Sequence, residues 1–181
     1  VPAPPTRHED LRTKPAAQIA YRSAYYSGYG PAPAVQRIYE RGEQAYRDLY
    51  KPFQKAINDK IHELTNWKVF IHCCGGIYPL IPMLIEAGLD AVNPVQTTCQ
   101  DMDPIRLKRE FGRDLTFCGG IRTQDLLAQG SPDEIRRDVR RMKRVMGAGG
   151  GYMLEPGITI QADVPAANIE ALIDEARRPG R

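Results

Sequence analysis

The feature that most constrains the fold is a repeated alternation of short apolar runs with amphipathic helical stretches. Each run is rich in β-branched, aromatic or small residues, ends near glycine or polar residues, and is followed by a helical pattern. The expected strands span 67–73, 90–95, 115–118 and 151–155, and the expected helices span 78–87, 103–111, 123–128, 131–146 and 165–177. This order predicts a parallel sheet of four buried strands with right-handed crossovers. Four such units make either a small open sheet or half of an eight-stranded barrel.

A further helix precedes the first strand. Apolar residues recur at three- and four-residue spacing and mark one face of a long amphipathic helix from about residue 43: Tyr46, Leu49, Tyr50, Phe53, Ile57, Ile61 and Leu64. Pro52 lies within this pattern and predicts a break or kink near Tyr50.

Residues 1–42 form a separate, irregular segment in this interpretation. They are rich in proline and tyrosine and show no clear periodicity. The unit expected to fold into strands and helices is 43–181. Since the chain starts at Val1 rather than Met, we expect sequence upstream of it.

Charge and composition exclude some partners. The formal net charge is only +3, with basic residues interleaved among acids, so we expect no nucleic acid partner. No apolar run approaches the ~18 residues that a membrane span needs, and no export signal is visible at the N-terminus. Four cysteines in such a chain indicate a reducing compartment, and we expect a cytoplasmic protein.

The first strand ends in a potential metal-binding pair. Alternation along a strand points His72 and Cys74 to the same side, whereas Cys73 points into the core. An imidazole and a thiolate are ligands that zinc prefers. The alternative is a strand-end histidine and a buried thiol that bind no metal.

Other strand ends carry polar candidates. Asn93 and Gln96 flank the end of the second strand and could hydrogen-bond a substrate carboxylate or amide, or cap the local loop. Arg122 follows the third strand and is either a carboxylate clamp or a surface arginine. Cys99 is expected to be a loop thiol near the site, with ligation as the alternative.

Several segments in order along the chain resemble the uroporphyrinogen decarboxylase superfamily. They are Tyr46–Pro52, Phe70–Gly76, Ile85–Gln96, Asp103–Gly112, Phe117–Ile121, Gly149–Gly157 and Asp163–Pro165. The resemblance covers about residues 43–178. It implies an α/β fold of the (β/α)8 TIM-barrel type, of which this chain holds about the C-terminal four βα units. The superfamily includes cofactor-free porphyrinogen decarboxylases and zinc-dependent methyltransferases that use corrinoids.

The resemblance also assigns roles to site residues. The zinc methyltransferases use a His-x-Cys pair, matched by His72 and Cys74, and a distant cysteine near the last strand. Ile158 stands where that cysteine is expected. Either Cys118, at the end of the third strand, or Glu155, at the end of the fourth, could replace it. Cys118 is assigned as the third metal ligand, and Glu155 joins the pair as a catalytic residue.

The resulting hypothesis is zinc-assisted methyl transfer from a methyl-corrinoid to a thiol, with a small-molecule substrate or a corrinoid protein as partner. The first alternative is decarboxylation of a porphyrinogen, which needs no cofactor; however, the histidine that the resemblance implies near 155–158 is absent. The second is a half-barrel that is inactive without self-association or a missing N-terminal half.

Overall fold

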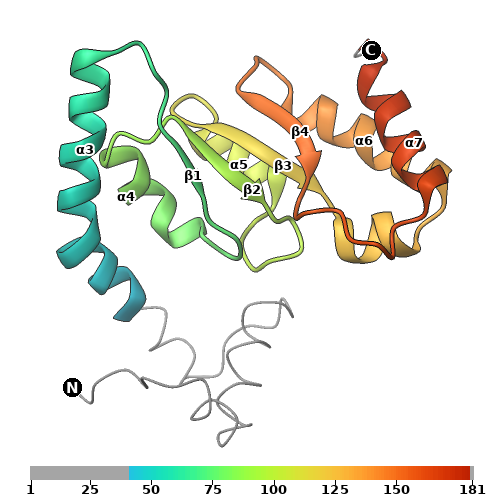
Figure 1. Ribbon diagram of the computed structural model, residues 1–181, viewed down its shortest axis with the longest axis horizontal. Helices are drawn as coiled ribbons and strands as arrows, with labels where there is room; N and C mark the ends of the chain where they lie inside the picture. The colour runs from blue at the N-terminus through green and yellow to red at the C-terminus, as the bar shows by residue number, and fades with distance from the viewer. Residues whose placement is uncertain (1–40, 180–181) are drawn as a thin grey trace, which may run out of the picture.

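A computed structural model describes residues 41–179, which form a four-stranded parallel sheet flanked by helices (Figure 1). The strands are β1 (Phe70–His72), β2 (Ala91–Val95), β3 (Thr116–Ile121) and β4 (Tyr152–Pro156). All neighbouring strands pair in parallel, in the order β1-β2-β3-β4. The predicted parallel sheet is therefore confirmed. The prediction of an irregular N-terminal segment falls almost wholly on residues 1–40, outside the described residues.

Helices follow the strands as the sequence pattern predicts. They are η1 (Tyr46–Tyr50), α3 (Lys51–Leu64), η2 (Tyr78–Leu80), α4 (Ile81–Glu86), α5 (Pro104–Phe111), η3 (Thr123–Leu127), α6 (Pro132–Met146) and α7 (Ala166–Arg177). The capping signals work as expected: the Ser131 side chain accepts a hydrogen bond from the Glu134 amide, and Glu134 bonds back to the Ser131 amide. Among the described residues, no helix is both long and apolar enough to cross a bilayer.

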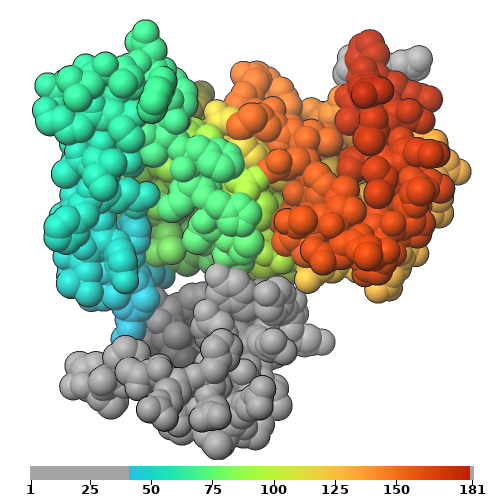
Figure 2. Space-filling view, viewed as in Figure 1, coloured from blue at the N-terminus to red at the C-terminus, as the bar shows by residue number. Residues whose placement is uncertain are grey.

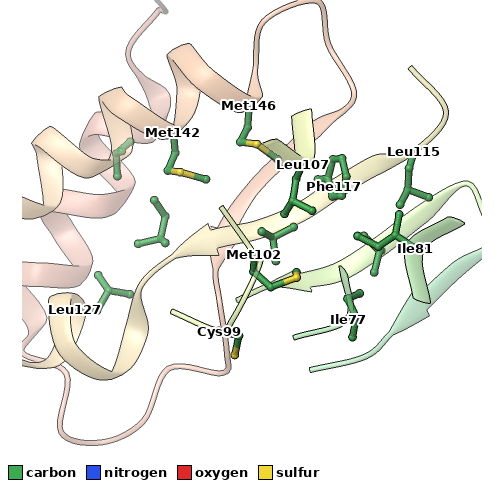
Figure 3. Close-up of a cluster of buried hydrophobic side chains, with 14 of the residues drawn as sticks. Ile77, Ile81, Cys99, Met102, Leu107, Leu115, Phe117, Leu127, Met142 and Met146 are labelled. Carbon is green, nitrogen blue, oxygen red and sulfur yellow. The ribbon is translucent and has the colours of Figure 1, made fainter. Parts of the chain in front are cut away.

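The strand order explains where the core lies. Parallel strands that follow one another in chain order, joined by right-handed crossovers, place their helices on one face of the sheet. A hydrophobic cluster fills the space between this face and the helices, with Phe117, Leu107 and Met142 fully buried (Figure 3). A doubly wound sheet would instead reverse its strand order. The arrangement is consistent with part of a TIM barrel, and within residues 41–179 the strands β1 and β4 form the two edges of the sheet.

The opposite face of the sheet has much less cover. Register and alternation place Phe70 on β1 and Met153 on β4 on this face, and they are 53% and 50% exposed. Figure 2 looks onto this side of the molecule, as does Figure 1, in which α5 and α6 lie behind the sheet. The prediction that all four strands are buried is wrong for the two at the edges, β1 and β4, in which no residue is fully buried. Only Phe70–His72 of the expected run form a strand, and Trp67 lies outside it, because β1 pairs on one side alone.

The helical segment formed by η1 and α3 does not bury its apolar face as an amphipathic helix packed on a core would. Near Tyr50, where the sequence predicts a break or kink, the helix changes type: π-helical bonding ends there and α3 begins with Pro52 in its first turn. The helix faces α4 through polar contacts, chiefly the buried Asn58, whose Nδ2 donates to the Ala87 carbonyl at 2.7 Å. Most of the apolar face remains exposed: Leu49, Tyr50, Phe53, Ile57 and Leu64 are all more than 60% accessible.

The third strand runs further than the sequence predicted. The sequence pattern predicts an end at Cys118, because two glycines follow, yet β3 continues through them to Ile121. Gly119 has a φ of 113°, and a Cβ there would lie 2.7 Å from the Val95 amide nitrogen. The glycine therefore permits a close approach of β3 to β2 that a side chain would block.

Candidate functional site

The predicted polar residues lie where the parallel strands end. His72 closes β1, Asn93 lies within β2, and Glu155 is the penultimate residue of β4. Gln96 and Arg122 come directly after β2 and β3. In parallel α/β folds this edge of the sheet is where ligands bind.

His72 and Cys74 make direct contact. The Cys74 Sγ and His72 Nε2 atoms lie 3.3 Å apart, as the predicted common orientation requires. Cys73 instead packs against the hydrophobic cluster. Burial, and secondarily the neighbouring Cys74, raises the pKa of the Cys73 thiol. The predicted division of the two thiols is confirmed.

The pair fits one half of a zinc site. Zinc bonds of about 2.0–2.1 Å to nitrogen and 2.3 Å to sulfur at tetrahedral angles imply an N–S separation of about 3.5 Å. The observed 3.3 Å is close to this value. Within residues 41–179, however, no three histidine, cysteine or acidic side chains are arranged to hold a metal together. The described residues therefore supply two donors, and a third has to come from elsewhere or from a rearrangement.

Cys118 and Glu155 form a second group, separate from this pair. Cys118 is 2% exposed, and burial raises the pKa of its thiol to about 11, with a smaller effect of the Glu155 charge. One Glu155 carboxylate oxygen is buried and accepts no hydrogen bond from the described residues. The role of Cys118 as a third ligand and that of Glu155 in catalysis stay predictions.

Cys99 is more buried than the sequence suggested. It is 7% exposed and lies in the hydrophobic cluster with Ile77 and Met102 rather than in an open polar loop (Figure 3). Burial, and to a lesser degree Cys74, raises the pKa of its thiol to about 11. The prediction of a loop thiol near the site agrees with this position, because Cys99 lies in the turn after β2 and close enough to Cys74 for that thiol to affect the pKa of Cys99. Its burial arises because this loop folds back over the core.

The amide residues after β2 are held by the first strand and its loop. Asn93 is the register partner of His72, and its backbone carbonyl accepts a hydrogen bond from the Cys73 amide. Gln96 is 5% exposed, and its Oε1 accepts a hydrogen bond from the Gly75 amide at 3.1 Å. Gln96 thus connects the end of β2 to the turn that follows Cys74.

A small pocket lies beside Gln96 and opens partly to solvent. It is lined by Gln96, Thr97, Thr98, Ile121, Arg122, Thr123, Gln124, Gly157 and Ile158. The pocket brings two predicted substrate-binding residues together, Gln96 and Arg122. Arg122 also forms an ion pair with Asp125, at 2.7 Å between Nη2 and Oδ2.

Sequence reasoning missed the pocket threonines. Thr97 and Thr98 directly follow Gln96, and Thr123 directly follows Arg122. The available signal was this adjacency, because hydroxyl residues after a strand end fall at the same edge as the residues already singled out.

The strands of the parallel sheet follow one another in chain order, and polar, ligand-type residues lie at their carboxyl ends. This arrangement is consistent with the class of α/β barrel proteins. The chain belongs to the uroporphyrinogen decarboxylase (URO-D) family, whose model matches residues 41–179. No curated protein sequence matches the chain.

One solved structure with a similar fold is a methyltransferase from Methanosarcina mazei. The match has a TM-score of 0.58 and 18% sequence identity, and it covers 74% of this chain. At that identity the likeness concerns the fold. The chain spans 36% of the methyltransferase's length.

Proposed function

We propose that this protein takes part in metal-assisted methyl transfer, with zinc bound by His72 and Cys74 and a methyl-corrinoid as donor. The observation that carries the proposal is the 3.3 Å contact between the two donor atoms. Zinc at this position would lower the pKa of a thiol acceptor and hold it as a thiolate, the nucleophilic form.

The chain's own residues would orient the reactants. His72 Nε2 and Cys74 Sγ provide two donors close together, because His72 is the last residue of β1 and Cys74 lies two residues beyond it. Asn93 lies beside His72 in register and can hydrogen-bond a substrate group at the pair. Glu155 is the better third donor of the two candidates, because burial raises the pKa of the Cys118 thiol to about 11 and so disfavours the thiolate that would bind a metal.

Partners and location belong to the same proposal. Phe70 and Met153 are exposed on the less covered sheet face, as expected of a barrel interior that further βα units would enclose. We propose that a self-associated copy or an N-terminal half-barrel covers this face, and that a corrinoid protein or small molecule delivers the methyl group. A cytoplasmic location fits the thiol state of Cys73 and Cys118.

Zinc binding is the direct test. We expect the purified protein to hold near-stoichiometric zinc by elemental analysis. His72→Ala and Cys74→Ala should each weaken zinc affinity by at least about a hundredfold, measured by competition with a chromophoric chelator. Cys73→Ala is the matched control for Cys74, and His62→Ala for His72, because His62 bonds Asp90 at the far end of α3.

Equal zinc affinity in all four variants would contradict the proposal. Loss of zinc from the control variants alone would place the metal elsewhere.

Porphyrinogen decarboxylation is the second candidate, because the matching family model carries that name. It would need no metal, and Glu155, with a buried oxygen that lacks a donor among the described residues, is the group best placed to hold a cationic or N–H-bearing intermediate. Turnover of uroporphyrinogen by zinc-depleted protein would favour this reading over methyl transfer.

A further inference from the structure

Gln96 is held in one orientation by the backbone. Its Oε1 accepts a hydrogen bond from the Gly75 amide, so the oxygen and nitrogen of the side-chain amide cannot exchange places without losing that bond. None of the described residues accepts a hydrogen bond from Nε2. The residue is 5% exposed and lines the pocket, and Nε2 is not among the fully buried side-chain atoms that lack a partner, so this donor can be reached from the solvent side.

Two of the pocket hydroxyls are already engaged. Thr97 Oγ1 donates to the Gly120 carbonyl at 3.3 Å, and Thr123 Oγ1 accepts from the Ile158 amide at 3.3 Å. Uncommitted polar groups remain on Thr98 and Gln124, both of which are exposed. Neither residue carries a negative charge that would repel an anionic ligand.

Arg122 adds positive charge at the pocket wall. Its Nε and Nη2 atoms bond Asp125, which leaves Nη1 and its two N–H groups for another acceptor. Asp125 offsets the charge, so the pocket favours a singly charged, planar acceptor over a phosphate. The glycine-rich loop at 147–151 precedes β4, so it lies at the opposite edge and supplies no phosphate cradle here.

We propose that this pocket binds a carboxylate of the substrate, with the Gln96 Nε2 amide as its central donor and Arg122 at its rim. The inference deepens the proposed function and rests on it for the reaction. Gly75, which holds Gln96, directly follows Cys74. The substrate is therefore held by its carboxylate next to the turn that carries the metal-binding pair.

The test is a titration of the intact protein with propionate, followed in ¹H–¹⁵N spectra through the Gly75 backbone amide in every variant and, wherever Gln96 is present, also through the Gln96 side-chain amide. That signal is identified by its absence from Gln96→Glu, which keeps an oxygen for the Gly75 amide, so the fold is retained, but loses the donor and repels the ligand. Propionamide is the uncharged comparison ligand, and sodium chloride matches the ionic strength. Gln129→Glu, at an exposed position outside the pocket, makes the same charge change.

We expect saturable chemical shift changes with propionate. The affinity for propionate should be at least about tenfold lower in Gln96→Glu and unchanged in Gln129→Glu. Equal affinity in Gln96→Glu, equal affinity for propionamide, or a shift that does not saturate would overturn the proposal.

A last variant separates this inference from the zinc proposal. Cys74→Ser should lose zinc yet bind propionate as the unaltered protein does. If it loses propionate as well, the carboxylate lies on the metal and the pocket assignment is wrong. If the unaltered protein holds no zinc but Gln96 still reports saturable propionate binding, the carboxylate site stands and the metal proposal alone fails.

Discussion

Two strands of the same repeat, β3 and β1, differ sharply in their surroundings. β3 has six residues, five of them buried, and pairs with a strand on each side. β1 has three residues, of which two are exposed, and in the described part of the chain it pairs with β2 alone. Both runs are apolar and end near two glycines. The position of a strand in the sheet therefore decides its burial more than its composition does.

The part of the molecule that contributes most to stability is therefore not the part that carries the candidate metal-binding pair. The packing that resists unfolding is concentrated around β2, β3 and α6, where Phe117, Val92 and Val139 are fully buried. The pair of donor atoms lies at the open edge, on β1. An edge strand with a half-covered face is easier to remodel when a ligand or a partner arrives.

The strongest test of this division replaces one phenylalanine in each strand. Phe117→Ala should lower the free energy of unfolding by about 3–5 kcal/mol, because it empties a fully buried site. Phe70→Ala, at 53% exposure, should cost less than about 1 kcal/mol. Urea denaturation followed by circular dichroism measures both. Similar losses would mean that β1 is buried by a partner in solution, and dilution should then reduce the loss at Phe70.

A smaller effect is expected where β3 approaches β2. Gly119→Ala should cost about 3 kcal/mol, because its Cβ would meet the Val95 amide nitrogen at 2.7 Å in a backbone conformation that favours glycine. Gly149→Ala has a similar positive φ but no atom within 4 Å of the new Cβ, so about 1 kcal/mol is expected. Equal thermal shifts in the two variants would show that the close approach of the strands adds no strain.

The smallest effect is expected for Asp90, whose hydrogen bonds connect the start of β2 to the residues just before the edge strand β1. Asp90, just before β2, accepts hydrogen bonds from the Val69 amide, His62 and Lys68. Burial works against its ionised form, but these hydrogen bonds prevail and lower its pKa in the folded protein.

Its stabilising effect is therefore present above the unfolded pKa, near 4, and is lost as the pH falls through the lower folded value. Asp90→Asn should cost about 1 kcal/mol at neutral pH and flatten the fall in stability between pH 4 and pH 2. Urea midpoints across this range measure it, with the exposed Asp133→Asn as the control for charge. A parallel fall in Asp90→Asn and in the unaltered protein would refute the assignment.

Much of the fold followed from local signals. The capping box at Ser131, Pro104 in the first turn of α5, and Gly88 at the end of a helix each fix a boundary through one or two residues, so the sequence reveals them. The extension of β3 through Gly119 did not follow, because it depends on how near β2 comes. Glycine normally ends a strand, and only the tertiary contact makes it part of one.

The candidate site divides in the same way. The common orientation of His72 and Cys74 follows from the two-residue period of a strand, and it needs no knowledge of the rest of the molecule. The burial of Cys99 could not be predicted, since a polar loop sequence does not show which core it folds over. The pocket between Gln96 and Arg122 was likewise hidden, because its walls come from the ends of three strands.

By itself, the sequence determined the order of strands and helices, the parallel sheet, and the residue types at the strand ends, because periodicity and capping are local properties of the chain. The tertiary structure alone decided that β1 lies exposed at an edge, that Asp90 joins it to the neighbouring strand, and that the Gly75 amide fixes the orientation of Gln96. These depend on contacts between residues far apart in the chain, and their energies arise only when the sheet brings those residues together.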